Sequence, residues 1–253
     1  MKLNELSWIE AIKQVLSDNG GAASLEKMYG DILKYRDVST NNQWQATLRG
    51  ILYRDLRQTD EIVRVGLGVF SLKNSAASQS TFQMVAKNRS VSTSARHSET
   101  QGMLIELGNF YGYDTYTADP NMYFDEKRLG NIASLSDVPS FTGFEDLLNQ
   151  SKKIDVIWFS KRTQRSFPKK AFEVENTPEF KRSMLKLYQL RDLKTEFYLV
   201  ADTDKESLFE SRLNDDPFND IRDEFNFRSF ENVTRLYVAA AEHFILKEQF
   251  FPQ

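Results

Sequence analysis

The chain has 253 residues, a formal net charge of −3, no cysteine and two histidines. This composition excludes disulfides, thiolate zinc sites, a cysteine nucleophile and metal sites built on several histidines. No apolar run reaches the roughly 18 residues of a membrane span, the N-terminus lacks the apolar core of a signal peptide and no GxxxxGK[ST] loop is present, so we expect a cytoplasmic protein with no membrane partner and no nucleotide cofactor.

Three amphipathic helices and a hairpin are predicted over residues 1–73. Apolar residues recur at helical spacing over 5–17, 24–35 and 41–56. The first helix should stop at the sequence Asp18-Asn19-Gly20-Gly21, and Ser24 is a predicted N-cap of the second. Alternating residues about a glycine turn predict a hairpin over 62–72. Three short helices followed by a hairpin predict a winged helix-turn-helix domain.

The same residues resemble a known DNA-binding module. Trp8, Leu25, Tyr29, Leu48 and the ending over 65–72 look like the HARE-type winged helix-turn-helix. The resemblance implies that double-stranded DNA is bound and that the third helix enters its major groove. The polar candidates on that helix are Asn42, Gln43, Gln45, Thr47, Arg49 and Arg54. A solvated helix face is the alternative interpretation of these side chains.

Residues 74–98 are rich in Ser and Ala, which predicts a flexible linker, with His97 in a loop. An α/β domain is expected over 99–253. Its predicted helices cover 101–110, 144–148, 178–193, 205–213 and 231–249, and its extended segments cover 111–117, 154–159, 171–176, 196–202 and 225–230. The stretch 118–150 is longer than an ordinary loop.

Three carboxylates gather at two of these strands. Side chains two residues apart on a strand share a face, so Glu173 and Glu175 point one way, and Asp155 opens the neighbouring strand. Acids that converge without an intervening basic residue repel one another unless a cation binds. The pattern therefore predicts a divalent cation with oxygen ligands, whereas solvated acids at strand ends are the alternative.

The order of these elements resembles the PD-(D/E)XK nuclease superfamily over about residues 100–203. By that resemblance Asp155 and Glu173 match the two motif acids, Glu106 on the first helix matches a further acid, and Glu175 stands where the motif usually has Lys. The resemblance implies Mg²⁺ as cofactor, with Mn²⁺ as a substitute. Glu175 would then bind the metal or accept a proton from the attacking water. Lys169 lies about 13 Å from Glu173 along the strand and is a candidate phosphate contact.

The sequence thus predicts a winged helix-turn-helix joined to a restriction-endonuclease-like mixed sheet flanked by helices. The leading hypothesis is a metal-dependent DNA endonuclease of restriction type, with a requirement for a modified base and a homodimeric state as open options. A catalytically inactive DNA-binding scaffold is the second hypothesis, because the motif Lys is missing, and an RNA-directed nuclease is the third. Arg182, Lys186 and Arg191 on the helix after the site either face phosphate or form a solvated face.

Overall fold

A computed structural model describes residues 6–39, 41, 43–59, 61–66, 69–73, 75, 93–125, 127–161 and 166–250. The chain forms two compact units, which are Met1–Val91 with Leu236–Gln253, and Ser92–Arg235. The predicted domain boundaries, 1–73 and 99–253, do not include the return of the last 18 or so residues to the first unit.

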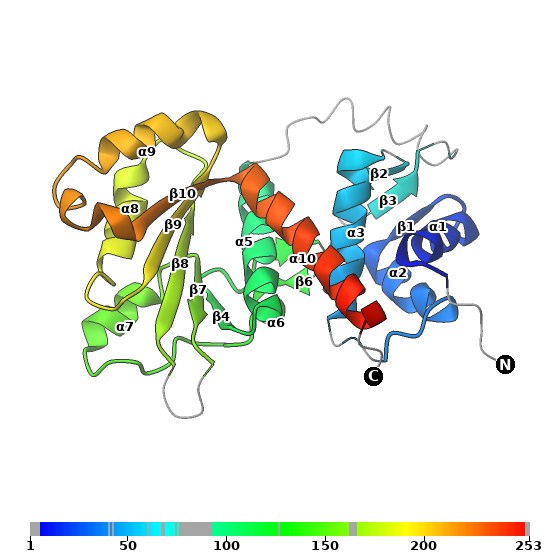
Figure 1. The fold of residues 1–253 in the computed structure, drawn as a ribbon, viewed down its shortest axis with the longest axis horizontal. Coiled ribbons are helices and arrows are strands. Elements are labelled where there is room, and N and C mark those ends of the chain that lie inside the picture. The colour runs from blue at the N-terminus through cyan, green and yellow to red at the C-terminus, as the bar shows by residue number, and fades with distance from the viewer. Residues whose placement is uncertain are drawn as a thin grey trace. The chain divides into compact units, whose positions relative to one another are not determined.

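The first unit contains helices packed with a small antiparallel sheet (Figure 1). Its elements are α1 (Trp8–Asp18), β1 (Ala22–Ser24), α2 (Leu25–Asp31), the 3-10 helix η1 (Ile32–Lys34), α3 (Trp44–Gln58), β2 (Ile62–Gly66) and β3 (Val69–Leu72). Gly20 and Gly21 adopt φ of 74° and 94° where α1 ends, and the hydroxyl of Ser24 accepts a hydrogen bond from the amide of Lys27. The expected helices, hairpin and N-cap are therefore present, and β1 is an additional strand.

The C-terminal part of α10 (Phe230–Phe250) belongs to this first unit. The buried ring of Tyr237 lies edge-on to Tyr53 with 6.1 Å between ring centroids, and its hydroxyl donates to the carbonyl of Ala46 at 3.4 Å. A helix predicted from its own periodicity thus contributes an aromatic side chain to α3.

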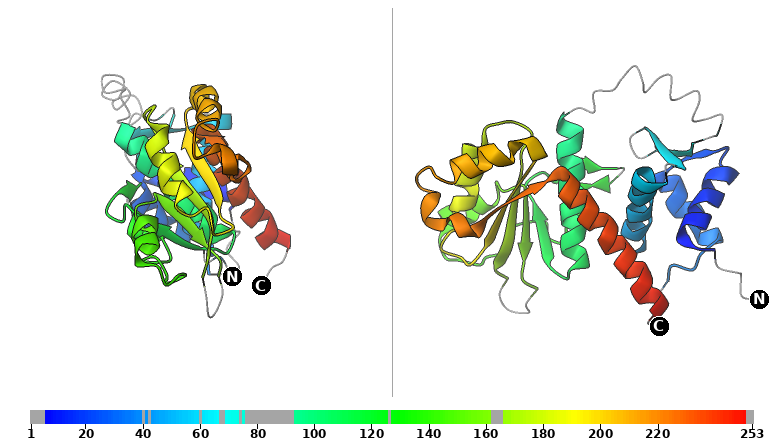
Figure 2. Two further views of the ribbon diagram at one scale, coloured as in Figure 1. Left: turned by 90° about the vertical axis from the view of Figure 1, so that its left-hand side faces the viewer. Right: turned by 45° about the horizontal axis from the view of Figure 1, so that its top comes forward.

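The second unit is a five-stranded mixed sheet with helices on both faces (Figure 2). Its helices are α5 (Thr93–Phe110), α6 (Leu129–Ile132), α7 (Glu145–Ser151), α8 (Phe180–Tyr188), α9 (Glu206–Arg212) and the 3-10 turns η2 (Thr203–Lys205) and η3 (Asn219–Glu224). Its strands are β4 (Asp114–Thr117), β7 (Val156–Phe159), β8 (Pro168–Val174), β9 (Glu196–Ala201) and β10 (Phe225–Ser229), with a separate ribbon of β5 (Tyr123–Phe124) and β6 (Lys127–Arg128).

The sheet order is β10-β9-β8-β7-β4, in which β10, β9 and β8 are parallel and β7 and β4 are antiparallel to their neighbours. Alternation along β7 sends Ile157 and Phe159 to the core on the α8 face, whereas the indole N–H of Trp158 donates to the carbonyl of Leu104 on α5. Both faces of the sheet are covered, which explains why β7 is buried at every position.

Two predictions for this unit need correction. Helix α5 begins at Thr93, so residues 93–98 are helical and His97 is not in a loop. The stretch 118–150 is also more ordered than expected, because it contains β5, β6 and α6 in addition to the predicted short helix. Among the described residues, none of the helices is long and apolar enough to cross a membrane.

Candidate active site

Three neighbouring strands have their ends together at one end of the sheet, which we call the site edge. Thr117 pairs with Val156, and Val156 pairs with Phe172, in two antiparallel ladders. The carboxyl ends of β4 and β8 therefore lie beside the amino end of β7. Asp119 follows β4 by two residues and Asp155 immediately precedes β7, so the topology brings side chains that are distant in sequence to the site edge.

Asp155 and Glu173 lie against each other across the β7–β8 ladder. The amide of Asp155 donates to Oε1 of Glu173 at 3.3 Å, and the amide of Val174 donates to Oδ2 of Asp155 at 2.8 Å. Each carboxylate is thus fixed by a backbone amide of the other strand. The predicted proximity of these two acids is present in the structure.

Both acids are removed from water, since Asp155 is 8% exposed and Glu173 is 1% exposed. Burial, reinforced by the nearby charge of Asp155, raises the pKa of Glu173 to about 8. Burial also raises the pKa of Asp155, although His97, the Val174 amide and Lys186 oppose the shift. These residues are not solvated acids at strand ends, and two desolvated carboxylates close to each other favour a bound proton or cation.

Lys186 on α8 supplies a positive charge to this pair. Its Nζ donates to Oε2 of Glu173 at 2.7 Å and lies 3.9 Å from Oδ1 of Asp155. Burial acts to lower the pKa of Lys186, but attraction to Glu173 and Asp155 outweighs it and the pKa is raised. The ammonium group is therefore charged at neutral pH and points at both acids.

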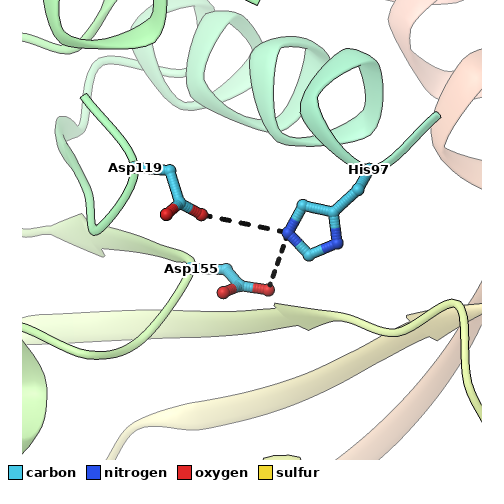
Figure 3. Close-up of side chains that lie close together, drawn as sticks. All are labelled: His97, Asp119 and Asp155. Carbon is cyan, nitrogen blue, oxygen red and sulfur yellow. Dashed lines mark ion pairs between the residues drawn. The ribbon is translucent and has the colours of Figure 1, made fainter. Parts of the chain in front are cut away.

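His97 and Asp119 approach the same aspartate from its other side (Figure 3). The Nε2 atom of His97, near the start of α5, lies 3.5 Å from Oδ2 of Asp155 and 3.9 Å from Oδ2 of Asp119. One ligand atom from each of these three residues lies within 4.8 Å of the others. Among the described residues, this is the group of His and acidic side chains with the spacing of a metal site.

Glu175 lines a cavity together with these residues but makes different contacts. Its Oε2 accepts a hydrogen bond from the hydroxyl of Ser183 on α8 at 2.9 Å. Its Oε1 accepts from the amide and the hydroxyl of Thr177, at 2.9 and 2.8 Å. Glu175 therefore connects the turn after β8 to Ser183 on α8, and Ser183 lies one helical turn before Lys186.

The site opens into two adjoining hollows. The first has a volume of about 570 Å³ and is lined by His97, Asp119, Met122, Asp155, Glu173, Val174, Glu175, Asn176, Thr177, Arg182, Ser183 and Lys186. The second, of about 670 Å³, is lined by Gln150, Pro178, Glu179, Lys181, Arg182, Leu185, Lys186, Gln189 and Arg212. Arg182 and Lys186 border both, so the acidic cavity continues into a groove with four cationic side chains and one acid.

Two other predicted residues of this unit lie away from the cavity. Glu106 is buried on α5, about 13 Å along the helix axis from His97, and does not line the cavity. Lys169 lies on β8 at partial exposure and does not line it either. A position on the first helix or on the motif strand did not by itself bring these side chains to the strand ends.

The predicted DNA-reading residues of α3 differ in accessibility. Thr47 is 0% exposed and donates to the carbonyl of Gln43 at 3.3 Å, while Arg49 is 2% exposed and its guanidinium donates to the hydroxyl of Tyr29. As placed, neither side chain is available to a base edge. Gln43, Gln45 and Arg54 are partly exposed, and Asn42 lies outside the described residues.

Sequence reasoning did not place His97 and Asp119 in the site, and it considered Lys186 only as a phosphate contact or as part of a solvated face. Lys186 follows Ser183 by one helical turn and Glu173 by thirteen residues, so the basic residues of the helix after a suspected acidic strand were the available signal. Asp119 stands just after a strand that pairs with β7, which is visible only once the strand order is known. His97 had no signal, because its segment was assigned to a linker.

A family model described as the type II restriction enzyme NmeDI C-terminal domain matches residues 77–251, which is most of the chain. No curated protein and no solved structure matches.

Proposed function

Because the chain belongs to the family of the type II restriction enzyme NmeDI C-terminal domain, we propose that it is a metal-dependent endonuclease that hydrolyses phosphodiester bonds in double-stranded DNA. Membership of the family indicates a nuclease of restriction type. The observation that carries the hydrolytic proposal is the contact of Asp155 and Glu173 at the site edge, with the ammonium group of Lys186 against both.

The donor set fits a hard divalent cation. Asp155 and Glu173 offer buried carboxylate oxygens. Burial raises the pKa of both acids, and the charge of Asp155 raises the pKa of Glu173 further, so a bound cation would favour their ionised forms. Mg²⁺, or Mn²⁺ in its place, would lower the pKa of water and neutralise charge on the phosphoryl oxygens. In this proposal Asp155 and Glu173 hold the ion.

In this proposal Lys186 does what the lysine of the nuclease motif usually does, because Glu175 stands at the position of that lysine. An ammonium group at hydrogen-bonding distance from the metal-binding acid can orient the attacking water or donate to a phosphoryl oxygen. Its place on a helix rather than on β8 keeps the same charge at the site edge. The absence of Lys from the strand therefore does not favour an inactive scaffold.

Glu175 has a positioning part in this proposal. Both of its carboxylate oxygens already accept hydrogen bonds, from Ser183 and Thr177. Through Ser183 it holds the start of α8, and so sets where Lys186 reaches the acids. Because a carboxylate oxygen that accepts one hydrogen bond keeps a second lone pair, Glu175 could also act directly as metal ligand or proton acceptor while keeping these bonds.

The basic groove beside the cavity is the proposed path of the DNA backbone. Lys181, Arg182, Lys186 and Arg212 line it, and phosphate oxygens are the natural partners of such a row of cations. Because Arg182 and Lys186 border both hollows, a strand lying in the groove would pass directly over the acids. The net negative charge of the whole chain does not oppose this local attraction.

The first unit is the proposed DNA-selecting module. Its three helices and hairpin fit the winged helix-turn-helix predicted from the sequence, and Gln43, Gln45 and Arg54 on or next to α3 are the accessible candidates for contact. A homodimer would provide the two sites that cutting both strands requires. A requirement for a modified base is an open option that a comparison of modified and unmodified substrates decides.

Cleavage assays test the function directly. Supercoiled plasmid and genomic DNA, modified and unmodified, would be incubated with the protein and Mg²⁺ or Mn²⁺. We expect nicked or linear products that disappear on chelation and in Asp155→Asn and Glu173→Gln. Binding of every substrate without cleavage by the wild type would instead support the inactive scaffold, and cleavage unaffected by both substitutions would refute this site.

A further inference from the structure

His97 and Asp119 lie next to Asp155 and have no part in the function proposed so far. His97 Nε2 is 3.5 Å from one aspartate oxygen and 3.9 Å from the other. Both distances exceed the roughly 2.7–3.2 Å of a hydrogen bond. They match the roughly 3.0–4.2 Å that separates two ligand atoms each about 2.1 Å from a common ion.

Each aspartate oxygen that faces His97 accepts a hydrogen bond from another residue. Oδ2 of Asp155 accepts from the amide of Val174 at 2.8 Å, and Oδ2 of Asp119 accepts from the side-chain amide of Gln101 at 2.7 Å. Hydrogen bonds of this kind orient metal ligands in known sites. The remaining oxygen of Asp155, Oδ1, faces Lys186, so the two oxygens of this carboxylate serve different neighbours.

A buried, unpartnered oxygen lies next to the group. Gln101 stands one helical turn after His97 on α5 and is 0% exposed, and its Oε1 has no hydrogen-bond partner although its Nε2 is bonded to Asp119. An unsatisfied buried acceptor is costly. This oxygen belongs to the same amide group whose nitrogen orients Asp119, so a polar atom without a hydrogen-bond partner among the described residues is buried beside the group.

We propose that His97, Asp119 and Asp155 form a cation position of their own, which shares Asp155 with the carboxylate pair and takes a divalent first-row transition ion rather than Mg²⁺. The imidazole nitrogen decides the class of ion, because Mg²⁺ prefers oxygen ligands and water whereas transition ions accept imidazole. The role of this ion rests on the proposed nuclease function. Its binding, however, can be measured without DNA.

Pulsed electron paramagnetic resonance of Mn²⁺ bound to the full-length protein tests the nitrogen ligand. The chain has two histidines, His97 and the exposed His243, so a ¹⁴N coupling typical of a bound imidazole has two sources at most. We expect the coupling in the wild type and in His243→Gln, and its loss in His97→Gln. Asp119→Asn should weaken Mn²⁺ binding about tenfold or more.

A second version of the experiment leaves His97 intact. In the His243→Gln variant labelled with ¹⁵N-histidine, the coupling should change from ¹⁴N to ¹⁵N, which assigns it to His97 even if His97→Gln folds poorly. No nitrogen coupling in the wild type, or a coupling that survives in folded His97→Gln, would overturn the proposal. A nitrogen coupling in a protein that cuts no DNA would support the cation site and contradict the proposed function. Cleavage of DNA without the coupling would contradict the cation site and leave the proposed function standing.

Discussion

The Nζ atom of Lys186 lies 2.7 Å from Oε2 of Glu173, although the two residues belong to a helix and a strand separated by a turn. The contact joins an acid that is 1% exposed to a cation on the neighbouring helix. Because Lys186 also approaches Asp155, it partly compensates the charge that a metal ion would compensate further. Lys186 thus supplies a positive charge to the two acids although β8 is followed by Glu175 and not by a lysine.

Replacement of Lys186 by Met should abolish most cleavage while leaving the fold intact. The substitution keeps the length of the side chain and removes its charge, and loss of one positioned donor typically lowers the rate about 10²–10³-fold. Single-turnover cleavage measures the effect. Lys181→Met is the matched control, because Lys181 is on the same helix but lines only the outer groove. An equal loss in both variants would contradict a special part for Lys186.

The metal-free protein should become less stable as pH rises from about 5 to 8. Glu173 has a pKa of about 8 in the folded protein, against about 4.3 when unfolded, so in this range the folded state keeps a proton that the unfolded state has lost. The free energy of unfolding therefore falls with rising pH. Glu173→Gln stays neutral and should show a shallower slope.

Thermal unfolding in chelator at several pH values measures these slopes. Added Mg²⁺ should stabilise the wild type at pH 8 and have little effect on Glu173→Gln, because the ion needs the ionised acid. Parallel pH dependence of the wild type and the variant would show that Glu173 is not the group responsible.

Arg212→Ala should weaken DNA binding with little effect on the cleavage rate of bound substrate. Arg212 lines the basic groove away from the acids, and removing one cation that binds a phosphate should reduce the slope of log affinity against log salt by about 0.9. Binding titrations at several salt concentrations provide the slope. Arg222→Ala is a suitable control, since both arginines form surface ion pairs 3.1 Å long but Arg222 does not line the groove. The same change of slope in both variants would contradict the proposed path of the DNA.

Gly108→Ala should destabilise the second unit. A Cβ at this position would lie 2.4 Å from Cγ2 of Thr115 and 2.7 Å from Nε1 of Trp158, whose N–H is bonded to the carbonyl of Leu104. Overpacking of this kind costs about 1–3 kcal/mol. Urea unfolding measures the loss. Gly143→Ala, where a Cβ meets nothing within 4 Å, should be nearly neutral, and equal destabilisation of the two variants would contradict the explanation.

The sequence determined the elements whose signals are local. Periodicity predicted α1, α3, β7, β8 and α8 near their observed positions, because the burial of one face imposes a helical or alternating pattern on neighbouring residues. It also placed Asp155 and Glu173 together, since pairing of two successive strands brings such positions close to each other.

The tertiary structure alone decided which other side chains reach that pair. Lys186, Asp119 and His97 come from a helix on one face, a strand end and a helix on the other face, and their meeting depends on sheet order and helix packing rather than on any local pattern. The same reason explains why Arg49 is buried against Tyr29 although its sequence position suggested a surface for DNA. Local periodicity fixes the direction in which a side chain points, whereas only packing between distant segments fixes what it meets.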